Sequence, residues 1–153
     1  MLHDMYIETQ FSVFLINKPG VLAQTLEALG KSRINILALT MMDSVEHGVL
    51  RLTTGHHQKT REVLEKLNVS VNETDVLCLT IANQAGALSD IATRLAKEHV
   101  NINYAYCTAG ARGGRTTAVL KVADIKKAMK ILSGGPTKKK AKKTVRPQPR
   151  SRR

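Results

Sequence analysis

The sequence predicts an α+β protein made of two consecutive units of β-α-β-β-α-β order, with antiparallel sheets that carry their helices on one face. Three observations support this fold class. The chain contains a gapless internal repeat, its apolar residues alternate between strand-like runs and helical spacing, and its excess positive charge is concentrated at one end. The repeat sets the domain organisation.

The internal repeat aligns residues 17–39 with residues 83–105 at a constant offset of 66. Seven of the 23 aligned pairs are identical, and no gap is needed. Chance similarity would not keep one offset over this length, so the chain is read as two copies of one structural unit. The identical pairs are Asn17/Asn83, Gly20/Gly86, Leu22/Leu88, Leu29/Leu95, Lys31/Lys97, Asn35/Asn101 and Ile36/Ile102.

Each copy begins with a strand, a turn and a helix. Residues 11–16 and 76–81 are apolar runs rich in strand-forming residues, and each stops at an Asn that is followed by Gly three positions later. Apolar residues then recur at helical spacing, which predicts a helix of about three turns that buries one face. These residues are Val21, Leu22, Leu26 and Leu29 in the first copy and Ala87, Leu88, Ile91 and Leu95 in the second.

A hairpin and a second helix follow in each copy. Strands are expected over residues 36–42 and 49–53, and in the second copy over 102–108 and 117–122. Turn-forming residues at 43–48 and 110–115 join them. Further apolar residues at helical spacing predict the second helix, namely Val63, Leu64 and Leu67, or Ile125, Ala128, Met129 and Leu132.

The order corresponds to the ferredoxin-like split βαβ arrangement. Residues 69–71 supply a closing strand for the first unit, whereas no closing strand is visible in the second. Either that sheet keeps an open edge or another strand covers it, since uncovered edges are usually protected. The expected domains are a first unit over residues 6–73, a second over 74–133 and a tail over 134–153.

The charge is unevenly distributed. The formal net charge is +12, yet residues 138–153 hold nine basic and no acidic residues, which leaves +3 for the rest of the chain. Such a segment buries too little apolar surface to fold, so a disordered Lys/Arg-rich tail is expected. Residues 138–153 could contact nucleic acid non-specifically through phosphates, or form an appendage without a partner.

Several function classes are excluded. No apolar stretch is long enough to span a membrane and no signal peptide is visible, so a cytoplasmic protein is expected. Cys78 and Cys107 lie in apolar runs and should be buried thiols. No Cys or carboxylate accompanies His56-His57 at metal-ligand spacing, so a solvated loop is favoured over a metal site. No cofactor, metal or catalytic constellation is found, which predicts a protein that is not an enzyme.

The candidate binding motif is Asn17-Lys18-Pro19-Gly20, between the first strand and the first helix. A side-chain oxygen here can cap the helix, and Gly20 lets a ligand approach the backbone. Free amides at the helix start can hold an anion such as an α-carboxylate. Asn35, at the entry to the next strand, offers both a donor and an acceptor.

Asn-x-Pro-Gly-x-Leu after a strand, followed by Ile-Asn-Ile about fifteen residues on, resembles the ACT domain, a small-molecule regulatory module of amino-acid metabolism. The chain is most similar to small tandem ACT proteins, some of which resemble regulatory subunits of acetolactate synthase. The resemblance implies an amino-acid sensor whose ligand lies between the strand-to-helix loop of one module and the second strand of a neighbour. It also implies edge-to-edge pairing of modules, hence a homodimer, and a possible biosynthetic enzyme partner such as acetolactate synthase.

Carried over by position, the resemblance selects ligand-binding residues in both units. Serine-binding ACT modules have a His two residues before the loop Asn, where this chain has Leu15 and Ile81, so that contact is absent. The second unit also replaces the loop Pro with Ala85. The residues implied are Asn17, Pro19, Gly20, Val21, Leu22 and Asn35 in the first unit, and Asn83, Gly86, Ala87, Leu88 and Asn101 in the second.

Overall fold

The computed structural model describes residues 2–43, 47–108, 110 and 113–134. The expected tail, apart from Gly134, lies outside the described residues, as do parts of both hairpin joins. The elements follow the expected order in both units. They are β1 (Leu2–Ile16), α1 (Val21–Lys31), β2 (Ala38–Met42), β3 (His47–Thr53), α2 (His57–Lys66), β4 (Ser70–Ala82), α3 (Ala87–Lys97), β5 (Ile102–Cys107), β6 (Arg115–Val122) and α4 (Ile125–Ser133).

The described strands form one antiparallel six-stranded sheet in the order β2-β3-β1-β4-β6-β5. Alternate residues of β1 and β4 point to the same face because side chains alternate along a strand. On this face Phe11, Val13 and Leu15 pack with Leu29 of α1 and Leu64 of α2. Leu77, Leu79 and Ile81 pack in the same way among residues of α3 and α4. The predicted α+β class, with helices on one face, is confirmed.

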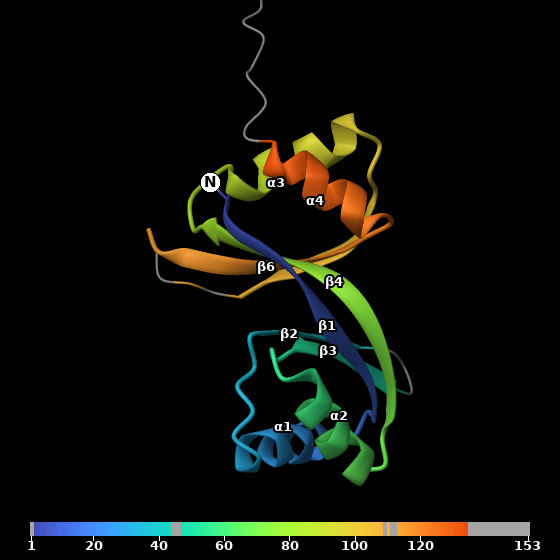
Figure 1. The fold of residues 1–153 in the computed structure, drawn as a ribbon. Helices are drawn as coiled ribbons and strands as arrows, with labels where there is room; N and C mark the ends of the chain where they lie inside the picture. The colour runs from blue at the N-terminus through green and yellow to red at the C-terminus, as the bar shows by residue number, and fades with distance from the viewer. Residues whose placement is uncertain (1, 44–46, 109, 111–112, 135–153) are drawn as a thin grey trace, which may run out of the picture.

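The two longest strands, β1 and β4, belong to both halves of the molecule (Figure 1). Residues 9–14 of β1 pair with residues 70–75 of β4 and close the first unit. Residues 4–8 continue the same ladder against residues 76–80, and Leu2 pairs with Ile81. The amino-terminal end of β1 therefore covers the edge for which the sequence showed no closing strand.

The observed strands are longer than the sequence pattern indicated. Residues 2–10 include His3, Asp4, Glu8, Thr9 and Gln10, so they lack the continuous apolar run that marked residues 11–16 as a strand. Similarly, the separate strands expected at 69–71 and 76–81 are one strand, β4. The expected unit boundary at 73/74 falls inside β4, and the division of the chain into domains stays a prediction.

The helix-free face of the sheet folds onto itself. The helix pairs α1/α2 and α3/α4 lie at opposite ends of the molecule, with the strands between them (Figure 1). Ala38 of β2 packs with Val76 and Cys78 of β4 and with Val119 of β6. Tyr6 and Tyr106 are partly buried against the same cluster. We call this contact between the two half-sheets the seam.

A polar network centred on Gln10 crosses the seam. Gln10 is fully buried, and its Nε2 donates to the hydroxyl of Tyr104 at 2.7 Å and to that of Ser12 at 3.3 Å. Tyr106 donates its hydroxyl to Gln10 Oε1 at 3.0 Å. The Arg51 guanidinium lies 4.4 Å from the centroid of the Tyr104 ring. These contacts join β1 and β3 of the first half-sheet to β5 of the second.

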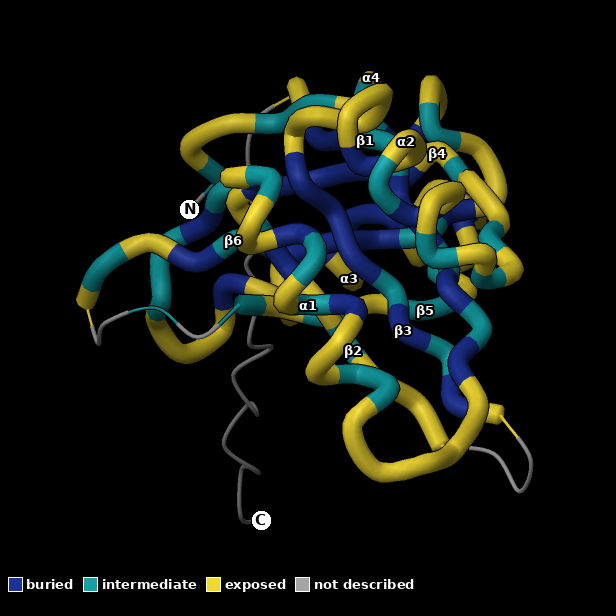
Figure 2. Tube along the Cα trace, turned by 90° about the horizontal axis from the view of Figure 1, so that it is seen from below, coloured by how far each residue is buried: buried dark blue, intermediate teal, exposed yellow. Residues whose placement is uncertain are grey.

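Burial follows the strands, whereas the connections are mostly exposed (Figure 2). Both cysteines are free, and Cys78 is buried as expected. The expectation for Cys107 was wrong: its side chain is exposed, because β5 is an edge strand and Cys107 is its last residue. Among the described residues, no helix is both long and apolar enough to cross a membrane.

Candidate functional site

The two strand-to-helix loops share one backbone geometry. Gly20 and Gly86 are the residues directly before α1 and α3, and both have a φ of +89°. This left-handed conformation favours glycine, which accounts for the Asn-x-x-Gly pattern in both copies. Neither helix has a side-chain cap, so the expectation that the loop Asn caps the helix was wrong. The Asn lies three residues before the glycine and points elsewhere.

In the first unit, the loop is open to solvent. Asn17 donates from Nδ2 to Oδ1 of Asp43, the residue that follows β2, at 3.4 Å. Pro19 and Gly20 are exposed, whereas Val21 and Leu22 are half-buried against the core of the first unit. Of the candidate residues, Asn17 through Leu22 therefore lie together around the start of α1.

In the second unit, the loop is held against the β5–β6 hairpin. The Asn83 Nδ2 donates to the carbonyl of Gly110 at 2.9 Å, and the Asn83 backbone N–H donates to the carbonyl of Gly114 at 2.8 Å. Asn83 is half-buried, in contrast to Asn17. The second loop is thus tied to a neighbouring strand pair and has a defined position.

A small cavity of about 160 Å³ lies at this second loop. It contains Asn83, Gly86, Ala87 and Leu88, which are four of the five candidate residues of the second unit. Ala87 is buried and Leu88 is largely exposed. The complete lining is Ile81, Ala82, Asn83, Gln84, Gly86, Ala87, Leu88, Ser89 and Thr116.

The start of α3 offers hydrogen-bond donors to this cavity. The Ala87 N–H donates to the Gln84 carbonyl at 3.3 Å, and the first bond within the helix runs from the Asp90 N–H to the Gly86 carbonyl at 2.9 Å. The amides of Leu88 and Ser89 lie between these two and, as first-turn amides, have no hydrogen-bond partner within the helix. Such amides, together with the helix dipole, favour a carboxylate or another anion.

Asn35 and Asn101 do not join these loops within their own units. Each lies beyond the carboxyl end of its helix, and α1 and α3 both contain 11 residues. A helix of that length spans about 16 Å, so Asn35 and Asn101 lie a helix length away from Asn17 and Asn83. Both asparagines are exposed. A site that combines a loop with one of them requires a neighbouring unit.

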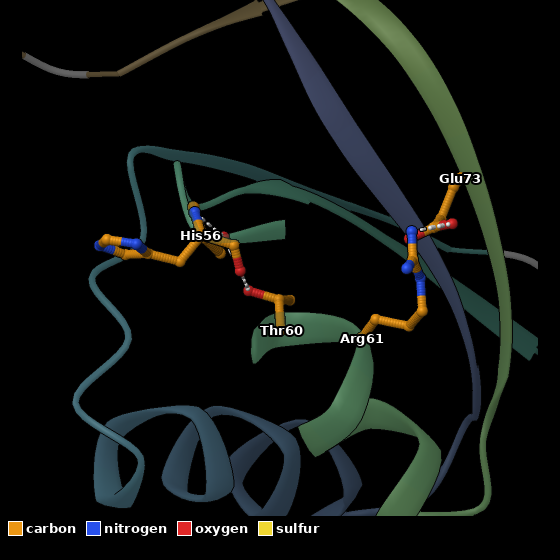
Figure 3. A network of polar contacts seen from close by, with 5 residues as sticks. His56, Thr60, Arg61 and Glu73 are labelled. Carbon is orange, nitrogen blue, oxygen red and sulfur yellow. Dashed lines mark hydrogen bonds and ion pairs between the residues drawn. The ribbon is translucent and has the colours of Figure 1, made fainter. Parts of the chain in front are cut away.

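His56 and His57 lie at the start of α2, and Figure 3 shows His56 next to Thr60, with Arg61 beside Glu73. The His56 N–H donates to the Thr54 hydroxyl at 3.2 Å, and the buried Thr60 donates its hydroxyl to the His56 carbonyl at 2.9 Å. Arg61 of α2 forms a two-pronged ion pair with Glu73 of β4, with N–O distances of 2.8 and 2.9 Å. Both groups of contacts hold α2 in place.

Within the described part of the chain, no three His, Cys, Asp or Glu side chains are grouped to hold a metal ion.

A family comparison decides what this fold is. The sequence model of the ACT domain pair family matches residues 5–134. The chain belongs to this family. This match confirms the resemblance that was read from the two Asn-x-x-Gly loops. ACT domains are regulatory modules. A search of curated proteins gave no match.

Solved structures share this fold. Protein BT0572 from Bacteroides thetaiotaomicron is similar with a TM-score of 0.77 and 30% identity, over 84% of this chain and 88% of that one. The regulatory subunit of aspartate kinase from Thermus thermophilus, in a ligand-free form, has a TM-score of 0.62 and 13% identity, over 86% and 96%. Aspartokinase alpha and beta subunits give 0.61 and 18%, also over 86% and 96%.

Some residues of the ACT domain pair that contribute to the site were not singled out from the sequence. Gly110 and Gly114 were read only as turn residues, yet their carbonyls hold Asn83. Thr116, the second residue of β6, lines the small cavity. No sequence signal identifies these contacts, because they depend on β6 pairing beside β4.

Proposed function

We propose that this protein is an amino-acid-binding regulatory module and that the loop of the second unit holds the ligand. The cavity at Asn83, Gly86 and Leu88 carries this proposal, because it combines an anion-binding helix start with an apolar wall. Membership of a family of regulatory modules supports it. A ligand held here would act through its differential affinity for two arrangements of the protein or its assembly.

Calorimetric titration with each of the twenty amino acids tests the proposal. We expect at least one to bind at millimolar concentration or below, and Asn83→Ala to weaken that binding because the loop loses its bond to Gly110. The matched control is Asn17→Ala, which changes the same repeat position where the side chain is exposed. If no amino acid binds, or if Asn83→Ala binds as the parent does, the proposal fails.

The assembly proposed is a homodimer that pairs through β2. This strand lies at one edge of the sheet and exposes Leu39, Met41 and Met42. An uncovered edge with apolar side chains is a template for a second strand. Analytical ultracentrifugation should show a dimer for the parent chain and a monomer for Leu39→Lys, whereas a monomeric parent would contradict this arrangement.

The partner proposed is a separate enzyme of amino-acid biosynthesis. The similar regulatory subunit of aspartate kinase is itself a separate chain, and acetolactate synthase is the partner type suggested by the sequence. Co-purification of the untagged protein from its own cells, followed by identification of the captured enzyme, tests this.

Nucleic acid is the other partner proposed, bound through the basic residues 138–153. An experiment that compares nucleic-acid retention by the full chain and by residues 1–137 tests it. Retention that survives the truncation would exclude the tail as its cause.

A further inference from the structure

The positive charge of the folded part is concentrated in one half of the molecule. Residues 9–75, which include α1 and α2, contain seven basic and seven acidic residues, so this half is neutral. Residues 2–8 and 76–134, which make up the half with α3 and α4, contain eight basic and five acidic residues. The two helix pairs lie at opposite ends of the molecule (Figure 1). The excess charge therefore lies on the half that leads into the basic residues 138–153.

The lysines of α4 form one exposed surface. Lys126, Lys127 and Lys130 are all exposed, whereas Ala128 is buried in the core of the second unit. Lys130 follows Lys126 by four positions, so both side chains lie on one side of the helix, about 6 Å apart along its axis. No acidic residue follows Asp124, the residue that caps the start of α4, within this helix. The outer side of α4 is thus basic along its length.

The carboxyl end of α3 adds a cation beside this helix. Lys127 donates from Nζ to the carbonyl of Glu98 at 2.6 Å, which ties the start of α4 to the end of α3. Lys97, the last residue of α3, directly precedes Glu98 and is exposed. Within the described ranges, the ion pairs involve none of the lysines of α4 and not Lys97. We call Lys97, Lys126, Lys127 and Lys130 the lysine surface.

A buried arginine offsets the negative end of the α4 dipole. The last carbonyls of a helix carry partial negative charge, which would otherwise separate the lysine surface from the basic segment beyond it. Arg94, of which 6% is exposed, donates from Nη2 to the carbonyls of Ile131 and Leu132 at 2.8 and 2.9 Å. No acidic residue lies between Lys130 and the last residue of the sequence. The lysine surface and residues 138–153 therefore follow each other as one basic region.

A closely spaced row of phosphates is the partner that matches this region. Double-stranded nucleic acid carries one negative charge per about 1.7 Å of its axis, and each phosphate that Lys or Arg neutralises releases a bound counterion. The lysine surface provides four cations, and residues 138–153 provide nine. Contacts of this kind fix the position of a protein on the duplex but do not read its bases.

The positions of the aromatic residues favour a duplex over a single strand. Proteins bind single strands by stacking the bases on aromatic side chains. All five aromatic residues of this chain lie in β1 and β5, and none lies in α3, α4 or residues 134–153. Tyr104 and Tyr106 are hydrogen-bonded to Gln10 in the seam. The lysine surface can therefore hold phosphates, but it offers no platform for unstacked bases.

The apolar residues of α4 favour nucleic acid over a membrane. A helix that binds a membrane surface inserts an apolar face among the lipids. In α4 this face already packs inside the protein, and its exposed residues are three lysines and one serine. Ala128 and Leu132 are buried in the core of the second unit, and Ile125, Met129 and Ile131 are partly buried against it.

We propose that the lysine surface and residues 138–153 together bind the phosphate backbone of double-stranded nucleic acid, independently of its base sequence. This rests on the nucleic-acid partner proposed above and adds to it a folded surface and the duplex form of the ligand. Lys97 lies at the carboxyl end of α3, whereas the cavity at Asn83 lies at its start, about 16 Å away. The surface is therefore separate from the proposed amino-acid site.

Fluorescence anisotropy of a short labelled DNA duplex, titrated with the full chain at several salt concentrations, tests the proposal. We expect Lys126→Gln/Lys130→Gln to bind about tenfold more weakly than the parent and to reduce the slope of log affinity against log salt by about 2. The matched control is Lys59→Gln/Lys66→Gln, which removes two exposed charges from α2 at the other end of the molecule. This control should bind as the parent does.

The outcomes separate this proposal from the one on which it rests. Equal affinity and slope for the parent and Lys126→Gln/Lys130→Gln would overturn the lysine surface and leave residues 138–153 as the only contact. If the parent does not bind the duplex, both nucleic-acid proposals fail, and the amino-acid proposal stands or falls by its own titration. An equal loss in the α2 control would show that binding follows net charge alone and would contradict the proposal.

Other polyanions test the choice of partner. A single strand of the same length and vesicles that contain phosphatidylserine should bind more weakly than the duplex, and a duplex of unrelated sequence should bind equally well. Tighter binding of the single strand or of the vesicles would overturn the proposal. A strong preference for one duplex sequence would contradict recognition through phosphates alone.

Lysine acetylation gives a second readout that needs no substitution. Reaction of the full chain with an acetyl ester of N-hydroxysuccinimide, followed by mass spectrometry, measures the accessibility of each lysine. The duplex should slow the acetylation of Lys126 and Lys130 and leave that of Lys59 and Lys66 unchanged. Equal rates at Lys126 and Lys130 with and without saturating duplex would overturn the assignment of the surface.

Discussion

The two units share a backbone and differ in what surrounds it. Gly20 and Gly86 have the same φ, and the helices that follow have the same length. Yet Asn17 is exposed beside Asp43, whereas Asn83 is held by Gly110 and Gly114 next to a cavity. The sequence repeat therefore specifies the loop geometry, whereas the burial of the loop Asn differs between the two units.

The largest effect is expected from deleting the segment of β1 that closes the sheet of the second unit. A chain that begins at Thr9 loses the ladder between β1 and residues 76–81 and the packing of Leu2 and Met5. We expect the free energy of unfolding to fall by at least about 3 kcal/mol. Hydrogen exchange should show faster exchange in β4 beyond residue 76 and in α3 and α4. Protection lost first in α1 and α2 would contradict the pairing described here.

The next effect concerns the contact between the halves. Gln10→Ala leaves the hydroxyls of Tyr104 and Tyr106 without their partner and opens a buried space. The expected cost is about 2–4 kcal/mol, measured by urea unfolding. Ser12→Ala removes only the 3.3 Å contact and should cost less than about 1 kcal/mol. Equal costs would show that the Tyr contacts contribute nothing to the seam.

The pH dependence of the free energy of unfolding compares the buried Cys78 with the exposed Cys107. Burial raises the pKa of Cys78 from 9.0 to about 12. The folded state then holds the Cys78 proton more tightly than the unfolded chain does. The stabilisation from this proton is therefore fully present below pH 9 and is lost as the pH rises towards 12. The slope is at most about 1.4 kcal/mol per pH unit for this group.

Urea midpoints at pH 8, 9.5 and 10.5 measure this fall. Cys78→Ala should flatten the alkaline decline, whereas Cys107→Ala should flatten it less, because burial raises the pKa of the exposed Cys107 as well but by less than that of Cys78. Burial also raises the pKa of Tyr106, so part of the decline persists in Cys78→Ala. A variant curve that matches the parent throughout would exclude Cys78 as a contributor.

The smallest effect on the free energy of unfolding is expected from substituting the glycine that precedes α1 or α3, and it should be equal in both units. Gly20→Ala and Gly86→Ala each force a side chain into the left-handed region, and no atom lies within 4 Å of either new Cβ. Each should cost about 1–2 kcal/mol from backbone strain alone. Ligand binding should change only in Gly86→Ala. Unequal unfolding costs would show that the two loops differ in more than their surroundings.

The sequence predicted the order of the elements because the repeat presents each of them twice. It also located the strand-to-helix loops, since only glycine readily adopts their backbone conformation. It missed the first nine residues of β1, because His3, Asp4, Glu8, Thr9 and Gln10 leave no continuous apolar run there. The partner of that strand, residues 76–81 of β4, is about 75 positions away, and no local pattern encodes such pairing.

For the site, the resemblance to the ACT domain selected Asn83, Gly86, Ala87 and Leu88 by position, and these four residues line one cavity. It did not identify Gly110, Gly114 and Thr116 as neighbours of this loop. In the sequence these residues have the pattern of an ordinary turn and the start of a strand. They lie beside Asn83 only because β6 pairs with β4.

The reciprocal sharing of β1 and β4 also determines how the molecule can be divided. Each unit borrows its closing strand from the segment that opens the other, which is the geometry of a domain swap carried out within one chain. A fragment of residues 9–75 would keep its closing residues 70–75, whereas a fragment of residues 76–134 would lack residues 2–8. The second half of the chain therefore depends on the amino-terminal segment for a complete sheet, and the first half does not depend on the second in this way.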